Sequence, residues 1–418
     1  MKQKITMKTI KQDKEVYAIL KAEEKYQRDT IRLIPSENFA SPAVLQALGS
    51  VFTNKYSEGE PGKRYYQGNI NVDAVELLAI KRAKQFFSLD ENWHVNVKAV
   101  SAAIANFCVL NALLEPGQKI MAMNLPDGGH LSHGWDLPDG RKVTISSKMF
   151  QTVRYRVNEK TMVFDYYEIE KMEQKEKPQL IISGGTAYPR EINYKRLGAI
   201  AKKAGAFYMA DIAHEAGLIG AGVLSSPFAY ADVVTMSTQK TLRGPRASII
   251  CCKRKFGDRI DRSIFPGLQG GPFDNNIAAL AVALKEANSA DFRKYAAQVV
   301  KNATAFSDAL KNYGFTIVSG GTDKHLVLID LRNKNIDGSN AALLLEKANI
   351  ITNKNTIPYD TGTPFKPSGL RVGTPAMTTR GFKEKDFDKV AEFIDDVITQ
   401  KNPPELIKRA VLMMLKKF

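Results

Sequence analysis

The chain has 418 residues, of which 44% are hydrophobic and 25% charged, a balance typical of a globular protein with room for a large domain and a smaller one. No apolar run reaches the roughly 18 residues that a membrane-spanning helix needs, and the basic residues 1–8 lack the apolar stretch of a secretory signal, so we expect a cytoplasmic protein. The net charge of +16 favours anionic ligands, but the basic residues are not clustered with aromatic ones, which argues against a nucleic-acid-binding module.

The three cysteines, Cys108, Cys251 and Cys252, do not form a disulfide framework, and no Cys/His cluster has the spacing of a zinc site. All three lie in apolar runs, where a buried thiol is expected. We therefore predict neither disulfides nor a bound metal.

The first 70 residues alternate between helical patterns and loops. Charged and apolar positions alternate at helical spacing over residues 9–31, which predicts an amphipathic N-terminal helix. Ser41 and Pro42 have the residue types of an N-cap and a first helical position, so a second helix is expected there. The Gly and Pro content of residues 55–68 predicts an irregular loop, and its three tyrosines, two glutamates and three cations are typical of a binding surface.

The middle of the chain, from about residue 95 to 252, alternates short apolar runs with helical stretches such as 103–114 and 194–204. This rhythm predicts a mostly parallel sheet with helices on both faces. The strands that we expect are 95–97, 119–123, 180–183, 206–210, 232–237 and 248–252.

The pattern of the last third of the chain predicts a long helical region to about residue 313 and then a smaller α+β domain. Its expected elements are strands 316–319, 326–330 and 369–373, helix 339–347 and two closing helices. We therefore divide the chain into an N-terminal arm and helix, a large α/β domain and a small C-terminal domain, over residues 1–40, 41–290 and 291–418.

Two charged residues follow two of the predicted strands. Asp211 comes directly after strand 206–210, and Lys240 comes just after strand 232–237, where open α/β sheets bind their ligands. The two arginines near Lys240 favour loss of its proton, and a neutral amine can form a Schiff base. A lysine that binds an aldehyde and an aspartate that keeps a pyridine nitrogen protonated are the two anchors of a pyridoxal phosphate site. The alternatives without a catalytic role are a solvated basic turn for Lys240 and a helix N-cap for Asp211.

Three further features could complete such a site. His130 follows two glycines and could lie over a flat ring or move a proton. The Gly-rich segment 267–272 could offer backbone N–H groups to a phosphate, and Arg371 could pair with a substrate carboxylate. Each has an ordinary alternative, namely a loop histidine, a plain turn and a surface arginine.

Taken together, the motifs resemble serine hydroxymethyltransferase, a pyridoxal phosphate enzyme of fold type I, from about residue 10 to the end. The resemblance is carried by Pro35-Ser-Glu-Asn38, residues 54–66, Gly128-Gly-His-Leu-Ser-His-Gly134, Asp211-Ile-Ala-His214, Lys240-Thr-Leu-Arg-Gly-Pro-Arg246, residues 265–272 and residues 369–375. It implies an aminotransferase-like fold with a mostly parallel seven-stranded sheet and a small α+β domain. It also implies a homodimer, possibly a tetramer, with pyridoxal 5'-phosphate as cofactor and tetrahydrofolate as co-substrate.

The resemblance assigns a role to each matching residue. Lys240 would form the Schiff base, Asp211 would pair with the pyridine nitrogen and His130 would stack on the ring. Glu58 would manage protons at the substrate hydroxyl, with Tyr56 nearby from the other subunit. The other implied contacts are Ser101, Ala102, Ala103, Thr186, His214, Gln239 and Gly271 for the cofactor, Ser36, Tyr66 and Arg371 for the substrate, with Tyr66 also catalytic, and Leu125, Gly129, Leu131, Asn355 and Phe365 for folate.

The chain departs from the family pattern at the phosphate-binding loop. Where the family usually carries Ser-Gly-Ser after Asn-Val-Gln-Pro, this chain reads Asn96-Val-Lys-Ala-Val-Ser-Ala-Ala103, and Gln239 replaces the usual histidine before the lysine. We expect each lost hydrogen bond to the phosphate to weaken cofactor binding by about 1–3 kcal/mol. Lys98 could restore some of that attraction. Glu60 also replaces an aromatic residue that the family usually has.

The function that the resemblance implies is the reversible conversion of L-serine and tetrahydrofolate to glycine and 5,10-methylenetetrahydrofolate. Two alternatives stay open, a pyridoxal phosphate aldolase or transaldolase that acts on β-hydroxy amino acids without folate, and a degenerate paralogue that binds the cofactor poorly and acts as a binding partner. The matching folate motif favours the first function. Intact Lys240, Asp211, Arg371 and Glu58 argue against the degenerate paralogue.

Overall fold

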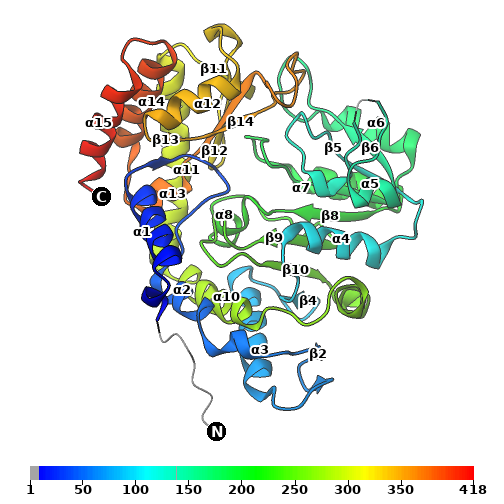
Figure 1. Ribbon diagram of the computed structural model, residues 1–418. Coiled ribbons are helices and arrows are strands. Elements are labelled where there is room, and N and C mark those ends of the chain that lie inside the picture. The colour runs from blue at the N-terminus through cyan, green and yellow to red at the C-terminus, as the bar shows by residue number, and fades with distance from the viewer. Residues whose placement is uncertain (1–8, 138) are drawn as a thin grey trace.

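The computed structural model describes residues 9–137 and 139–418 and is built around a seven-stranded sheet (Figure 1). The strand order is β4-β10-β9-β8-β7-β5-β6, and only β10 runs against its neighbours. This confirms the mostly parallel seven-stranded sheet. The strands are β4 Trp93–Asn96, β5 Lys119–Met123, β6 Gln151–Tyr155, β7 Leu180–Ser183, β8 Phe207–Asp211, β9 Val233–Ser237 and β10 Ser248–Lys253.

Helices cover both faces of this sheet, as the alternation of helical and apolar runs predicts. Because side chains alternate along a strand, Ile249 and Cys251 belong to one buried cluster, whereas Ile250 and Cys252 belong to the cluster on the other face. The helices of this part are α3 Ile70–Phe86, α4 Ala102–Leu113, α5 Ile145–Met149, α6 Tyr166–Glu176, α7 Tyr194–Ala204, α8 Ala216–Gly220, α9 Gly257–Arg262 and α10 Asp274–Ala287.

A second, four-stranded antiparallel sheet in the order β11-β12-β15-β14 lies above the first in Figure 1 and has a buried core of its own. Helix α11 (Ala290–Asn312) joins the two regions, since Phe292 packs in a core of the large sheet and Phe306 in the core of the small one. The other elements are β11 Thr316–Ile317, β12 Leu326–Asp330, α12 Gly338–Lys347, β14 Asn353–Asn355, β15 Gly369–Gly373, α13 Pro375–Thr379, α14 Glu384–Ile398 and α15 Pro404–Leu415.

The N-terminal segment crosses from one region to the other. Helix α1 (Lys14–Arg28) is amphipathic and none of its residues is buried. Strand β1 (Ile31–Arg32) then pairs in parallel with β13 (Ile350–Ile351), and α2 (Pro42–Leu48) packs on α10 with Ser41 as its N-cap. The domain boundaries at residues 40 and 290 stay predictions, and residues 1–8 lie outside the described part. No described helix has the length and apolar character that a membrane crossing needs.

The loop over residues 55–68 is more ordered than the sequence indicates. Strands β2 (Gly59–Glu60) and β3 (Lys63–Arg64) pair antiparallel, and Gly62 turns between them with a φ of 75°. The prediction of a wholly irregular loop is therefore wrong. Two-residue strands leave no alternation pattern to detect, and the hairpin is held by hydrogen bonds from the Arg64 side chain to the Ser57 and Gly59 carbonyls.

Candidate active site

A cavity with a volume of about 440 Å³ lies where β8 and β9 end and helix α4 begins. This is the edge of the sheet at which the sequence places the site. Its lining includes many of the predicted contacts, namely Ser36, Ser101, Ala102, Ala103, His130, Asp211, Gln239 and Lys240.

Lys240 carries an amine that is easier to deprotonate than an ordinary lysine. Burial, the largest cause, lowers its pKa to about 8, and the charges of Arg371 and Arg246 act in the same direction against Asp211. Arg243 instead lies over the ring of Tyr295, 4.3 Å from its centre. The expectation that two neighbouring arginines free the amine is thus corrected, because burial dominates and Arg246 is the one of the two among the main causes.

Asp211 ends strand β8 and is held as a carboxylate. Its Oδ2 accepts hydrogen bonds from Asn106 Nδ2 at 2.7 Å and His133 Nε2 at 2.9 Å, and its Oδ1 accepts one from the Ala213 N–H. Burial opposes ionisation, but the contacts with His133 and Asn106 hold the pKa of Asp211 well below its usual range. The N-cap alternative is wrong, since the cap of α8 is Glu215. Sequence reasoning missed both His133 and Asn106, although His133 stands three residues after His130.

His130 is a neutral imidazole at the wall of the cavity. Burial and the neighbouring His133 lower its pKa to about 4, and its Nδ1 lies 2.7 Å from Ser132 Oγ. Ligand atoms of His130, His133 and Asp211 lie within 4.8 Å of one another, a spacing that could hold a metal ion. One oxygen of Asp211 is already bonded to His133, and the expectation of no metal stays a prediction.

Arg371 is a buried cation that has no negatively charged partner among the described residues. Its guanidinium, on a residue only 8% exposed, donates to the Thr186 carbonyl and hydroxyl at 2.6 and 2.7 Å and to Asn353 Oδ1 at 3.1 Å. Among the described residues, no carboxylate lies within ion-pair distance of it, and burial lowers its pKa to about 10. A buried guanidinium with fixed orientation and no counter-charge is suited to bind a carboxylate ligand.

Thr186 and His214, which the resemblance assigns to the same side of the cofactor ring, lie side by side. The Thr186 hydroxyl is 3.2 Å from His214 Nε2, and His214 Nδ1 is 3.2 Å from His325 Nε2. Burial keeps both imidazoles neutral by lowering their pKa values well below the ordinary one. His325 has no counterpart among the predicted residues, because its strand (β12) belongs to the second sheet and the sequence does not reveal that contact.

The first turn of α4 forms the end of the cavity that could receive a phosphate. Ser101 caps the helix by accepting from the Ile104 N–H, while the N–H groups of Ala102 and Ala103 have no acceptor among the described residues. Gln239 places a buried, unpaired side-chain oxygen nearby, and Arg246 lines the same cavity. Free N–H groups at a helix N-terminus and an arginine together fit an anion.

Four predicted residues, Tyr56, Glu58, Tyr66 and Gly271, do not line this cavity. They lie together, since the Tyr66 hydroxyl donates to Glu58 Oε2 at 3.2 Å and the rings of Tyr56 and Tyr66 meet edge to face at 5.7 Å. A Cβ added to Gly271 would lie 3.3 Å from the Tyr56 ring. The structure of one protomer thus leaves these four residues as a separate group.

The residues predicted to contact folate come from two loops that touch. The Thr356 hydroxyl, next to Asn355, donates to the Pro126 carbonyl, next to Leu125, at 3.2 Å. Gly129 lies against the Met123 carbonyl so closely that a side chain there would clash. Leu131 and Phe365 are exposed, Phe365 at 82%, so both apolar side chains are available to a ligand.

The chain is similar to known proteins over most of its length. The model of the family described as serine hydroxymethyltransferase matches residues 9–394. A mitochondrial serine hydroxymethyltransferase from Candida glabrata is 48% identical over 402 residues, which cover 92% of this chain and 83% of that protein. A serine hydroxymethyltransferase from Desulfotalea psychrophila is 49% identical over 387 residues, which cover 93% of this chain and 89% of that protein. The chain therefore belongs to the serine hydroxymethyltransferase family.

Proposed function

We propose that this enzyme converts L-serine and tetrahydrofolate reversibly to glycine and 5,10-methylenetetrahydrofolate. The observation that carries the proposal is the pair of cations at one site, a partly buried Lys240 amine with a pKa of about 8 and a buried Arg371 that has no carboxylate partner among the described residues. An amine that reacts with an aldehyde and a guanidinium that binds a carboxylate are the two groups that an amino-acid-transforming pyridoxal phosphate enzyme needs.

The donor set of the cavity fits pyridoxal 5'-phosphate. When bound, the cofactor supplies an aldehyde for the lysine and a ring that accepts electrons from the substrate. Asp211, held ionised by His133 and Asn106, would keep the pyridine nitrogen protonated, and the neutral His130 would lie over the ring. Thr186 and His214 would orient the phenolic oxygen side.

The phosphate would be held chiefly by the N-terminus of α4, with Ser101, Gln239 and Arg246 around it. Ala102 and Ala103 are the first two residues of a regular helix, so their N–H groups remain available to the phosphate. Position 103 offers no hydroxyl, and we propose that the cofactor therefore dissociates more readily than from a site with serine there.

Substrate binding would use Arg371 and Ser36. Arg371 would take the substrate carboxylate, because Thr186 and Asn353 already fix its orientation. Glu58 would hold or release the proton at the substrate hydroxyl, with the Tyr66 hydroxyl donating to it. Leu125, Gly129, Leu131, Asn355 and Phe365 would receive the folate at the two touching loops.

We propose that the site is completed in a homodimer and that Tyr56, Glu58, Tyr66 and Gly271, which lie together as a separate group, serve the partner's site. These residues do not line the Lys240 cavity of their own protomer. Mixing E58Q with K240A protein tests this arrangement, because a mixed dimer regains one intact site only if Glu58 serves the other subunit. Activity in the mixture supports the proposal. A mixture as inactive as its components, with exchange of subunits verified, would contradict it.

The reaction itself is tested with the purified protein and added pyridoxal phosphate. We expect a visible absorption band from the bound cofactor and glycine formation from serine that depends on tetrahydrofolate. Glycine formation that ignores folate would favour an aldolase, and a protein without the band at saturating cofactor would overturn the proposal. The cytoplasmic location stays a prediction, since the relatives include a mitochondrial protein.

A further inference from the structure

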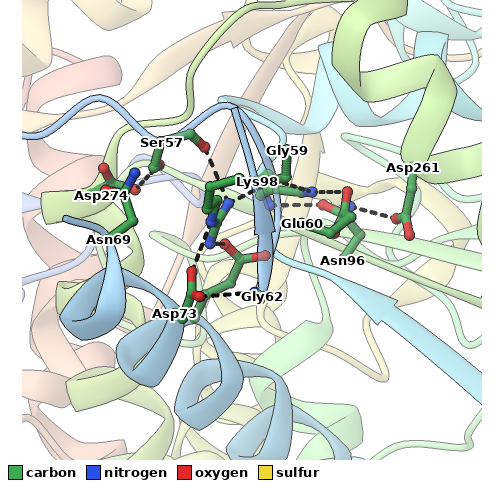
Figure 2. Close-up of polar contacts among 12 residues, drawn as sticks. Ser57, Gly59, Glu60, Gly62, Asn69, Asp73, Asn96, Lys98, Asp261 and Asp274 are labelled. Carbon is green, nitrogen blue, oxygen red and sulfur yellow. Dashed lines mark hydrogen bonds and ion pairs between the residues drawn. The ribbon is translucent and has the colours of Figure 1, made fainter. Parts of the chain in front are cut away.

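Lys98 lies buried beside the hairpin that follows Glu58, as Figure 2 shows. Its ammonium forms an ion pair with the Glu60 carboxylate and lies 3.5 Å from the Gly59 carbonyl. The Lys98 side chain is 2% exposed and that of Glu60 is 39% exposed. Lys98 therefore turns to the hairpin, so it does not supply the phosphate attraction that its position in the sequence suggests.

The backbone around Lys98 leads directly to the phosphate end of the cavity. The Lys98 N–H donates to Asn96 Oδ1 at 2.8 Å, and its carbonyl accepts from Gln269 Nε2 at 2.7 Å. The Val100 N–H donates to the same glutamine at 3.4 Å, and Ser101 then caps α4. A displacement of Lys98 would thus be transmitted through Ala99, Val100 and Ser101 to the first turn of α4.

The backbone around Glu60 leads to Glu58. The Glu58 carbonyl accepts from the Tyr65 N–H at 3.1 Å, and Arg64 donates to the Gly59 carbonyl at 2.6 Å. Figure 2 shows the Gly62 N–H bonded to Asp73 on α3 at the turn of the same hairpin. The hairpin is therefore a stiff unit, and the ion pair at Glu60 fixes where that unit lies against residues 96–101.

Among the charges around the hairpin, Glu60 is the direct partner of Lys98, and the buried Glu76 carboxylate acts on Lys98 from beyond ion-pair distance. Asp73 and Glu76 both form ion pairs with Arg64, at 2.8 and 2.6 Å. Among the described residues, Glu60 carries the only carboxylate within ion-pair distance of the Lys98 ammonium. A buried ammonium without a partner is strongly unfavourable, whereas a carboxylate that is partly exposed can be hydrated.

We propose that Lys98 and Glu60 are a positioning pair that holds the Glu58 hairpin against the segment leading into the phosphate-binding helix. The inference rests on the proposed function for the roles of Glu58 and of α4. Proton handling by Glu58 and retention of the cofactor then depend on one contact, although neither Lys98 nor Glu60 touches substrate or cofactor.

The test compares E60Q, K98M, the double variant E60Q/K98M and the charge-conserving K98R. E60Q removes the direct ion pair of a buried ammonium, so we expect kcat to fall about ten- to a hundredfold and the cofactor to dissociate more readily. The KM for serine should change little, because Arg371 is untouched. K98M should have a smaller effect, the double variant should recover most of the loss of E60Q, and K98R should resemble wild type.

The matched control is K119Q, which removes an ion pair of Lys119 with Glu176 at the start of β5, with 3.0 Å between nitrogen and oxygen. A readout independent of activity is tryptic cleavage after the exposed Lys63, the first residue of β3, next to the turn of the hairpin. E60Q should raise that cleavage and K119Q should not.

Each outcome decides the inference. Variants that lower the melting temperature but leave kcat, cofactor dissociation and cleavage after Lys63 at wild-type values would show a merely structural pair and overturn the inference. An E60Q loss that the K98M change does not relieve would also overturn it. A wild-type protein that binds no cofactor would refute the proposed function instead, and the cleavage comparison would then decide by itself whether the pair holds the hairpin.

Discussion

The Schiff base that we propose requires a neutral Lys240 amine, so the pH at which Lys240 loses its proton sets when it can form. An ordinary lysine has a pKa of 10.5, and burial, against the opposing charge of Asp211, lowers that of Lys240 to about 8. A difference of about 2.5 corresponds to about 300 times more neutral amine at pH 7. The cofactor-free protein should therefore react with pyridoxal phosphate at a rate that rises with pH and levels off above a midpoint near 8.

Stopped-flow absorbance from pH 6 to 10 measures this midpoint. Glu215 supplies a charge control, because its carboxylate raises the pKa of Lys240, and the E215Q change should move the midpoint to lower pH. The folded pKa of Lys240 lies below the unfolded one, so the penalty of burying its ammonium is present at low pH and disappears as the pH rises from about 8 to 10.5. A rate that keeps rising tenfold per pH unit through pH 10 would refute the reasoning, as would a midpoint that moves upward in E215Q.

Three further variants test other parts of the site. A103S adds a hydroxyl at the second residue of α4 and should tighten cofactor binding by about 1.5–3 kcal/mol, or about ten- to a hundredfold in Kd. The control A290S, at the first residue of α11, should leave the Kd unchanged. Equal dissociation constants for A103S and wild type would contradict the phosphate assignment. R371Q should raise the KM for serine about a hundredfold or more and leave binding of ethanolamine, which lacks the carboxylate, nearly unchanged; a parallel loss for both ligands would argue against a carboxylate site. In E215Q the buried ammonium of Lys324 loses its partner, so the free energy of unfolding in denaturant should fall by about 3–5 kcal/mol, and E215Q/K324M should largely restore it. An unchanged denaturant midpoint in E215Q would show that the pair adds no stability.

The sequence alone was sufficient to predict the architecture of the large sheet. Apolar runs of four to six residues between helical stretches predict buried parallel strands, and strands 119–123 and 180–183 lie where the structure has β5 and β7. The edge strand β6 escaped this reasoning because Gln151–Tyr155 carries mixed side chains, of which Tyr155 alone is fully buried. The seventh strand was expected only because the motifs resemble a known family.

The places of Asp211 and Lys240 could also be predicted, since Asp211 ends β8, Lys240 follows β9, and parallel strands end at the same edge. The partners that set their chemistry could not. His133 and Asn106 reach Asp211 from a loop and a helix that are distant in sequence, and His325 reaches His214 from the second sheet. The low pKa of Lys240 comes mainly from burial, which depends on the packing of the whole chain rather than on neighbouring residues.

Lys98 shows the same division between sequence and tertiary structure. The sequence determines that a lysine precedes the turn that we propose for phosphate binding and that a glutamate stands in the loop after Glu58. Only the folded chain decides that the two meet, because α3 and the hairpin bring together residues that are 38 positions apart in the sequence. Residue types and strand order thus specify what chemistry is available, whereas long-range packing decides which charges are buried together and so what each of them can do.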